Sequence, residues 1–292
     1  MIRTALTRHI SINGFLSKTF LQNGLKCQFC SSINNYKCEL MTIGSQKINY
    51  LKVGNGPKNI LCCPGNLGTI WTDFKPQIEG LDKNKFTIVV LDPPGHGGSR
   101  PPERVFTAKF YEEDGHTAYE LMQNLGLKPF SILGWSDGGV AAIFLAEKYP
   151  EAVDKLIIWG TFSYILEEER ELYEKLRDIS RWPEHIKAPF IKVYGEEVLQ
   201  NMQNSWYNAI QEIYKNNGDI CRSIVKNIKC PTLILHGDKD HLIYPEHPKY
   251  FMENIKDARI HHFPEGKHNI HIEYAEEFNN LVTNFILHGS KS

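Results

Sequence analysis

The sequence predicts an α/β fold in which a mostly parallel sheet carries helices on both faces. Short apolar runs rich in β-branched residues alternate with segments of helical periodicity. Strands are expected at residues 47–53, 60–63, 87–91, 130–133, 155–159, 232–236 and 259–263, and helices at 114–125, 137–147, 246–255 and 274–287. A chain of 292 residues is long enough for one such domain with an insertion.

The alternation is interrupted between residues 161 and 229, where no strand is convincing and Glu, Lys, Tyr, Trp and Leu recur at helical spacing. This stretch predicts a helical cap inserted into a core formed by residues 41–160 and 230–292. Open α/β sheets bind ligands at the carboxyl ends of their strands. We therefore expect the cap to cover that edge and to enclose a binding site.

Composition limits the kind of partner. The chain has 41% hydrophobic and 23% charged residues, and its 33 basic and 34 acidic side chains almost cancel. A near-neutral chain has no electrostatic footprint for nucleic acid or for an anionic membrane, and no apolar run is long enough to span a bilayer. A monomer acting on a small molecule is the expectation.

The N-terminal segment, residues 1–40, has a different composition. It has no Asp or Glu before Glu39, and its five basic side chains are interspersed with apolar, Ser and Thr residues. Such acid-poor, partly amphipathic segments are typical of mitochondrial targeting. The seven cysteines show no framework spacing and favour a reducing compartment; Cys27 and Cys30 form a single C-x-x-C pair, which is weak support for zinc.

The strongest chemical signal is Gly134-Trp135-Ser136-Asp137-Gly138, which satisfies G-x-S-x-G. A predicted strand precedes it and a predicted helix follows it, as a nucleophile elbow requires. In such an elbow the turn is so tight that flanking side chains would clash, and the serine hydroxyl stands at a helix N-terminus. The motif predicts Ser136 as the nucleophile of an α/β-hydrolase fold; the alternative is an ordinary serine N-cap.

A serine nucleophile needs a base, and the base needs a carboxylate to orient it. In this fold the order along the chain is Ser, acid, His, and Asp240 and His268 both follow predicted strands. Asp238 is a rival for the acid, and His261, His262 and His271 are neighbours of His268. We predict Asp240 and His268, with no metal ion or cofactor; a zinc interpretation of the histidine cluster lacks matching ligand spacing.

The tetrahedral intermediate requires two N–H donors. The backbone of Asp137 should supply one, and the loop Pro64-Gly65-Asn66-Leu67-Gly68 the other; we favour Leu67 over Asn66. The Asp137 side chain would lie beside the acyl carbon. It either binds a substrate ammonium or complements the helix dipole, and the sequence alone does not decide between these.

Several of these segments resemble the biphenyl hydrolase-like (valacyclovir hydrolase) family. The likeness is carried by residues 134–139, 92–102 and 264–269, and extends from about Met41 to the C-terminus. It implies hydrolysis of α-amino acid esters, including prodrugs and homocysteine thiolactone, without metal or cofactor, and a mitochondrial location. It also favours Asp137 as the ammonium receptor. Two departures from the family pattern stand out. Asn66 occupies a position where mammalian members have methionine, and Pro94 and His96 replace other residues in the family's turn loop.

The pocket itself is less well defined by the sequence. We predict substrate contacts for Asp137, Asn66, Trp135 and Trp159, and the aromatics Phe162, Tyr164, Trp182 and Trp206 are either cap lining or cap core. Two other functions remain open. A carbon–carbon bond hydrolase shares the fold and triad, but its substrates carry no ammonium for Asp137. A non-catalytic ligand-binding protein of this fold would not need all three triad positions filled.

Overall fold

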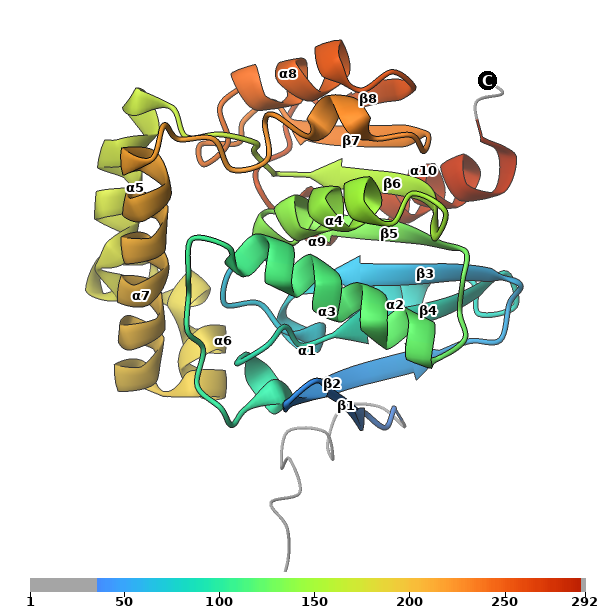
Figure 1. Cartoon of the computed structure of the whole chain (residues 1–292), viewed down its shortest axis with the longest axis horizontal. Helices are drawn as coiled ribbons and strands as arrows, with labels where there is room; N and C mark the ends of the chain where they lie inside the picture. The colour runs from blue at the N-terminus through green and yellow to red at the C-terminus, as the bar shows by residue number, and fades with distance from the viewer. Residues whose placement is uncertain (1–35, 290–292) are drawn as a thin grey trace, which may run out of the picture.

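A computed structural model describes residues 36–289, which form an eight-stranded sheet with helices on both faces (Figure 1). The strand order is β1-β2-β4-β3-β5-β6-β7-β8. All neighbours from β4 onward in this order are parallel, whereas β2 pairs antiparallel with both β1 and β4. The strands are β1 Glu39–Ile43, β2 Gln46–Val53, β3 Lys58–Cys63, β4 Phe86–Leu91, β5 Phe130–Trp135, β6 Val153–Trp159, β7 Thr232–Gly237 and β8 Ala258–Phe263. The predicted mostly parallel α/β fold is confirmed.

Helices cover the two faces of the sheet in the order that right-handed crossovers require. The helices are α1 Ile70–Asp73, α2 Lys75–Gly80, α3 Phe110–Asn124, α4 Asp137–Lys148, α5 Arg170–Arg177, α6 Glu184–Tyr194, α7 Glu196–Lys215, α8 Glu246–Asn254, α9 Ile270–Glu273 and α10 Ala275–His288. Helices α3 and α4 pack on one face, and α1, α2 and α10 contribute to the core on the other. The central strand β4 is buried throughout because both its faces are covered.

Helices α5, α6 and α7 lie between β6 and β7 in the chain and stand beyond the carboxyl ends of the parallel strands (Figure 1). Helix α7 buries one stripe of residues, which are Leu199, Met202, Gln203, Trp206, Ala209, Ile210 and Ile213. Their spacing of three and four positions places them on one side of the helix. That side faces the core, so polar members of the stripe lie at the boundary between the cap helices and the sheet domain.

Some element boundaries differ from those expected. Strand β1 was not predicted, and it includes Glu39 and Leu40 from the N-terminal segment, because their backbone pairs with Tyr50 and Asn49 of β2. Helix α3 begins at Phe110, four residues earlier than expected, so that Phe110 and Tyr111 are buried. Residues 1–35, which hold most of the predicted targeting segment and Cys27 and Cys30, lie outside the described residues.

Candidate active site

The backbone bends sharply at Ser136, between β5 and α4. Ser136 has φ 54° and ψ −124°, a conformation that costs a non-glycine residue about 1–3 kcal/mol. Its N–H donates to the Trp159 carbonyl at 3.0 Å, and its own carbonyl accepts from Gly139 at 2.9 Å. A Cβ at Gly138 would lie 2.1 Å from the Cys63 carbonyl oxygen, so a glycine is required there. This local geometry is that of a nucleophile elbow.

His268 and Asp240 come together at the same edge of the sheet, after β8 and β7. His268 Nδ1 lies 2.9 Å from Asp240 Oδ2, and the Asp240 side chain is 1% exposed. Its other oxygen accepts the N–H groups of Leu242 and Ile243 at 2.8 and 3.2 Å. Burial raises the pKa of this carboxyl, but the attraction of His268 and these hydrogen bonds outweigh burial, and the pKa is lowered overall.

The His268 ring is seated against the end of β6 and the elbow. A Cβ at Gly160, where φ is +54°, would lie 2.9 Å from His268 Cε1. Trp135, next to Ser136, donates its indole N–H to the His268 carbonyl at 3.1 Å, and the two rings are 5.3 Å apart between centroids. Ser136 is tied by its own N–H to Trp159, the residue before Gly160. The imidazole and the elbow therefore converge at the end of this strand.

The loop after β3 supplies the second strained residue of the site. Among residues 36–289, the non-glycine residues with positive φ are Leu67, Ser136 and Asn217. Strain of this kind persists where the surroundings impose it and often marks a functional site. The Leu67 carbonyl accepts the Tyr194 hydroxyl at 2.8 Å, and Asp73 accepts the Gly65 N–H at 3.0 Å. These contacts fix the loop at both ends, next to the elbow.

Asp137 is the first residue of α4, so its N–H has no acceptor within the helix. Its carboxylate is buried, with 7% of the residue exposed, and Oδ2 accepts the Trp206 indole N–H at 2.7 Å. Burial raises the pKa of this carboxyl to about 7, although the hydrogen bond from Trp206 and the nearby Tyr111 hydroxyl oppose the rise. A carboxylate desolvated to this degree gains much from a nearby cation.

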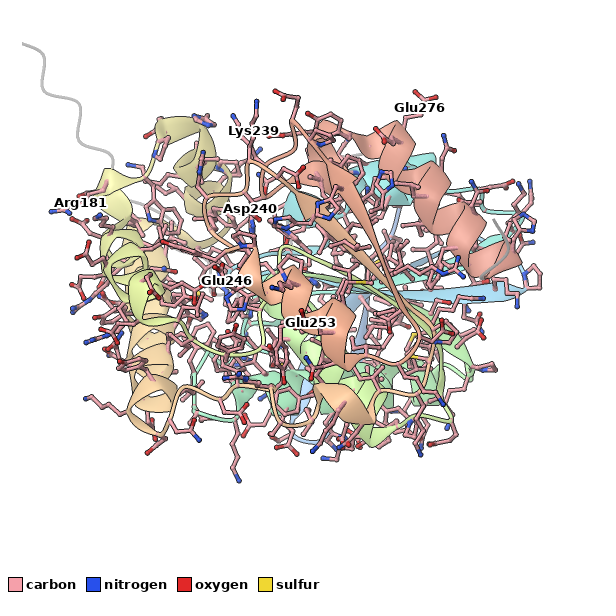
Figure 2. All side chains as sticks on the ribbon, turned by 90° about the horizontal axis from the view of Figure 1, so that it is seen from above. Arg181, Lys239, Asp240, Glu246, Glu253 and Glu276 are labelled. Atoms are coloured by element: carbon pink, nitrogen blue, oxygen red, sulfur yellow. The ribbon has the colours of Figure 1, made fainter. Side chains whose placement is uncertain are left out.

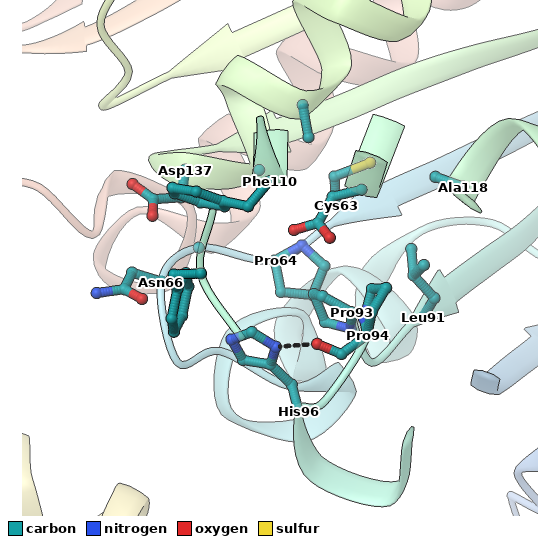
Figure 3. Close-up of a pocket in the computed structure, with 15 residues that line it drawn as sticks. Cys63, Pro64, Asn66, Leu91, Pro93, Pro94, His96, Phe110, Ala118 and Asp137 are labelled. Atoms are coloured by element: carbon teal, nitrogen blue, oxygen red, sulfur yellow. Dashed lines mark hydrogen bonds between the residues drawn. The ribbon is translucent and has the colours of Figure 1, made fainter. Parts of the chain in front are cut away.

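A cavity of about 30 Å³ adjoins Asp137 and the Leu67 loop. Figure 3 shows Asp137 and Asn66 at one end of the group of lining residues, Pro64 and His96 near its middle, and Pro93 and Pro94 toward the other end. The lining also includes Gly65, Leu91, Phe106, Asp114 and Ala118. This lining is largely apolar.

The sequence of this chain is similar to the sequences of known hydrolases. Residues 58–193 match the model of the alpha/beta hydrolase fold family. The chain is 41% identical over 247 residues to serine hydrolase BPHL of Mus musculus, covering 84% of this chain and 85% of the relative. It is 39% identical over 264 residues to serine hydrolase BPHL of Homo sapiens, covering 90% of each.

The chain belongs to the BPHL family of serine hydrolases.

The solved structures agree in fold with this family assignment. A meta-cleavage product hydrolase (CumD) from Pseudomonas fluorescens IP01 superposes with a TM-score of 0.68 at 21% identity, covering 85% of this chain and 96% of that one. Similarity at this identity shows the fold alone. As a member of the BPHL family, the protein is an enzyme with hydrolase activity.

The other candidate acid and base residues in this BPHL-family member make different contacts from those of the triad. Asp238 pairs with His262, at 2.7 Å from Nδ1 to Oδ1, and both side chains are more than 40% exposed. His271 is buried and accepts the Trp159 indole N–H at 3.0 Å. Burial and the neighbouring His268 lower the pKa of His271 to about 3, which keeps it neutral. Figure 2 shows Asp240 on the inner side of Lys239, whose side chain reaches outward.

One predicted substrate contact does not fit its position. Trp159 is 1% exposed, and its ring packs edge-on against Phe74 and Phe278 in the core between the sheet and α10. The ring is packed between apolar side chains instead of being exposed at the pocket. Trp135 is half-buried beside His268, and Asn66 lines the cavity while its amide donates to Gln203 of α7 at 3.1 Å.

The four cap aromatics pack within the cap or against the sheet domain, and they are not among the residues that line the cavity. Phe162 and Tyr164 pack against His247, and the Trp182 indole donates to the Leu176 carbonyl within the cap at 2.9 Å. Trp206 instead reaches Asp137. In the part of the chain that the structure describes, no group of three or more His, Cys, Asp or Glu side chains has the arrangement to hold a metal ion. Over the same residues, no helix is long and apolar enough to cross a membrane.

Sequence reasoning missed several residues that support the site. The Tyr194 and Gln203 contacts to the Leu67 loop join segments 127 and 137 residues apart, and no local pattern reveals them. Asp73 carries a pKa raised to about 7 by burial, and it anchors Gly65 from a short helix that was not predicted. Gly160 is the exception, since a glycine directly after an apolar strand is a visible signal of a close approach.

Proposed function

We propose that this BPHL-family serine hydrolase cleaves carboxylic esters of α-amino acids through an acyl-enzyme on Ser136. The observation that carries the substrate class is the buried Asp137 carboxylate, one residue after the nucleophile and next to an apolar cavity. An α-ammonium lies one bond from the carbon next to the acyl carbonyl, so a substrate attached to Ser136 brings its charge close to Asp137. Homocysteine thiolactone carries the same ammonium and falls in the same class.

In the proposed mechanism, His268 takes the proton of the Ser136 hydroxyl as the oxygen attacks the ester carbonyl. Asp240 holds the imidazole in the tautomer whose Nε2 accepts that proton and stabilises the imidazolium that forms. The N–H groups of Asp137 and Leu67 bind the oxyanion. His268 then protonates the departing alcohol.

The second half of the reaction repeats these roles with water. His268 removes a proton from the water molecule, which attacks the acyl carbon and regenerates the oxyanion. When the intermediate collapses, the proton returns to Ser136 and the free amino acid leaves. No step requires a metal ion or a cofactor.

A matched pair of substrates tests the proposed function. We would measure kcat/KM for the 4-nitrophenyl ester of L-valine and for that of 3-methylbutanoic acid, which lacks only the amine. A charge-assisted contact of about 2 kcal/mol predicts a preference of about 30-fold for the valine ester. In Asp137→Ala the preference should vanish while the des-amino ester is still turned over.

Two outcomes would refute the substrate assignment. Equal rates for both esters in the wild-type enzyme would remove the role of the ammonium. Equal loss on both esters in Asp137→Ala would mean that the side chain serves the fold or the oxyanion site instead. A carbon–carbon bond hydrolase, the other enzymatic candidate, would show no preference for the amine and would turn over ring-cleavage products.

We also propose that residues 1–40 direct the protein to mitochondria, on the basis of their basic, acid-poor composition. A fluorescent protein carrying these residues at its N-terminus should co-localise with a mitochondrial dye, and replacing their arginines and lysines by glutamine should abolish this. A diffuse signal from the unaltered fusion would contradict the proposal.

A further inference from the structure

A hydrogen bond crosses from the cap helices to the residue after the nucleophile. Trp206 of α7 donates its indole N–H to Asp137 Oδ2 of α4 at 2.7 Å, and the two residues are 69 positions apart in the sequence. Trp206 is 4% exposed and Asp137 is 7% exposed. A donor in such a dry environment has a larger effect than at the surface, because water does not compete for the acceptor.

The indole is itself held in place. The Tyr173 ring of α5 packs edge-on against Trp206, with centroids 5.6 Å apart. One turn earlier on α7, Gln203 accepts the Asn66 amide across the same boundary at 3.1 Å. Helix α7 therefore contacts two residues that line the cavity, Asn66 and Asp137, and the indole N–H has a fixed direction.

The other groups around Asp137 do not replace this donor. Tyr111 and Asp114 face the carboxylate from α3, Tyr173 acts from α5 through its neighbour Trp206, and Arg104 lies in the preceding loop. Arg104 is already engaged by both oxygens of Asp114 at 2.8 Å. The Tyr111 hydroxyl also acts on the Asp137 carboxylate, but its geometry falls short of a full hydrogen bond, and it lowers the pKa of Asp137 less than Trp206 does.

We propose that Trp206 is a positioning residue for amine recognition: its N–H engages Oδ2 of Asp137, keeps the carboxylate anionic and oriented, and leaves Oδ1 to bind the substrate ammonium. The proposal rests on the proposed function. Recognition of the amine would then depend on the position of α7 over the core, because displacement of the helix would remove the Trp206 N–H from Asp137.

The test removes the N–H and keeps an aromatic ring. Trp206→Phe should lower the preference for the valine ester over the 3-methylbutanoate ester about ten-fold, since a hydrogen bond to a charged group has an effect of that order. The loss should appear in KM for the valine ester, and the constants for the des-amino ester should stay within about two-fold. Trp182→Phe is the matched control, because its indole donates within the cap.

The pH dependence separates this role from a structural one. Titration of the triad affects both esters equally, so it cancels in the ratio of the two kcat/KM values. The acid limb of this ratio then reports the ionisation of Asp137. Burial raises the pKa of Asp137 to about 7, and the Trp206 hydrogen bond opposes this rise. Without the donor the pKa rises, so the acid limb should move to higher pH. The alkaline limb belongs to the α-amino group of the substrate and should not move.

The outcomes distinguish the two proposals. A wild-type enzyme with no amine preference would refute the proposed function. A wild-type preference that survives in Trp206→Phe, with an unmoved acid limb, would refute the role of Trp206 alone. If Trp206→Phe does not fold, β-(3-benzothienyl)alanine at this position keeps the shape of tryptophan without the N–H. The same loss of preference and the same shift are then required, and their absence would overturn the inference.

Discussion

Replacing Asp240 by asparagine should abolish most of the activity while leaving the fold intact. Asparagine keeps an oxygen for the Leu242 and Ile243 N–H groups. It turns an NH₂ group toward His268 Nδ1, which favours the tautomer that carries its proton on Nε2. That tautomer does not accept the serine proton, and the imidazolium loses its countercharge.

The magnitude follows from the geometry. Unit charges 2.9 Å apart, the Nδ1–Oδ2 separation, attract by about 6 kcal/mol at an effective dielectric constant of about 20. At 1.36 kcal/mol for each factor of ten, kcat should fall by about four orders of magnitude. In serine proteases the same change of acid to amide lowers kcat by a similar factor, about 10⁴.

The assay is release of 4-nitrophenol at saturating ester, with circular dichroism to verify the fold. The matched control is Asp238→Asn, two residues away, which also removes a carboxylate paired with a histidine but at an exposed position. It should change kcat by less than about two-fold, since exposed pairs contribute little. A large loss in Asp238→Asn together with a small one in Asp240→Asn would refute the assignment of the acid.

Three further predictions concern the supports of the site. Gly160→Ala should lower kcat on both esters at least about ten-fold, because a Cβ would lie 2.9 Å from the imidazole and φ is +54°; unchanged kinetics would contradict this. Tyr194→Phe should lower kcat on both esters several-fold in steady-state assays, because it frees the Leu67 carbonyl; a change confined to the valine ester would argue otherwise. His247→Ala should reduce the free energy of unfolding in urea by about 3–5 kcal/mol, because Glu169, 2.7 Å away and buried, loses its partner; a change smaller than about 1 kcal/mol would rule this out.

The elbow and the order of the triad could be predicted from the sequence because their signals are local. A glycine pattern between a strand and a helix defines Ser136, and two loops after strands offer Asp240 and His268. The choice between Asp238 and Asp240 needs coordinates. Both follow β7. Asp240 is buried, accepts two N–H groups and contacts His268, whereas Asp238 is exposed and pairs with His262.

The cap contacts were beyond sequence reasoning for a different reason. Periodicity places Trp206 on the buried stripe of α7, but it does not say which surface that stripe meets. The bond to Asp137 depends on how α7 crosses the core, and this is set by packing between segments distant in the chain. For Trp159 the prediction was wrong in the opposite direction. Its position at the end of a strand predicted a substrate contact, but its ring packs into the core.

The most direct test of the account is to label the enzyme with a fluorophosphonate, which reacts with activated serines, and to map the adduct by peptide mass spectrometry. If Ser136 is the nucleophile, one adduct forms on Ser136 in parallel with loss of esterase activity, and Ser136→Ala shows neither adduct nor activity. A modified residue elsewhere, or undiminished turnover by Ser136→Ala, would contradict it.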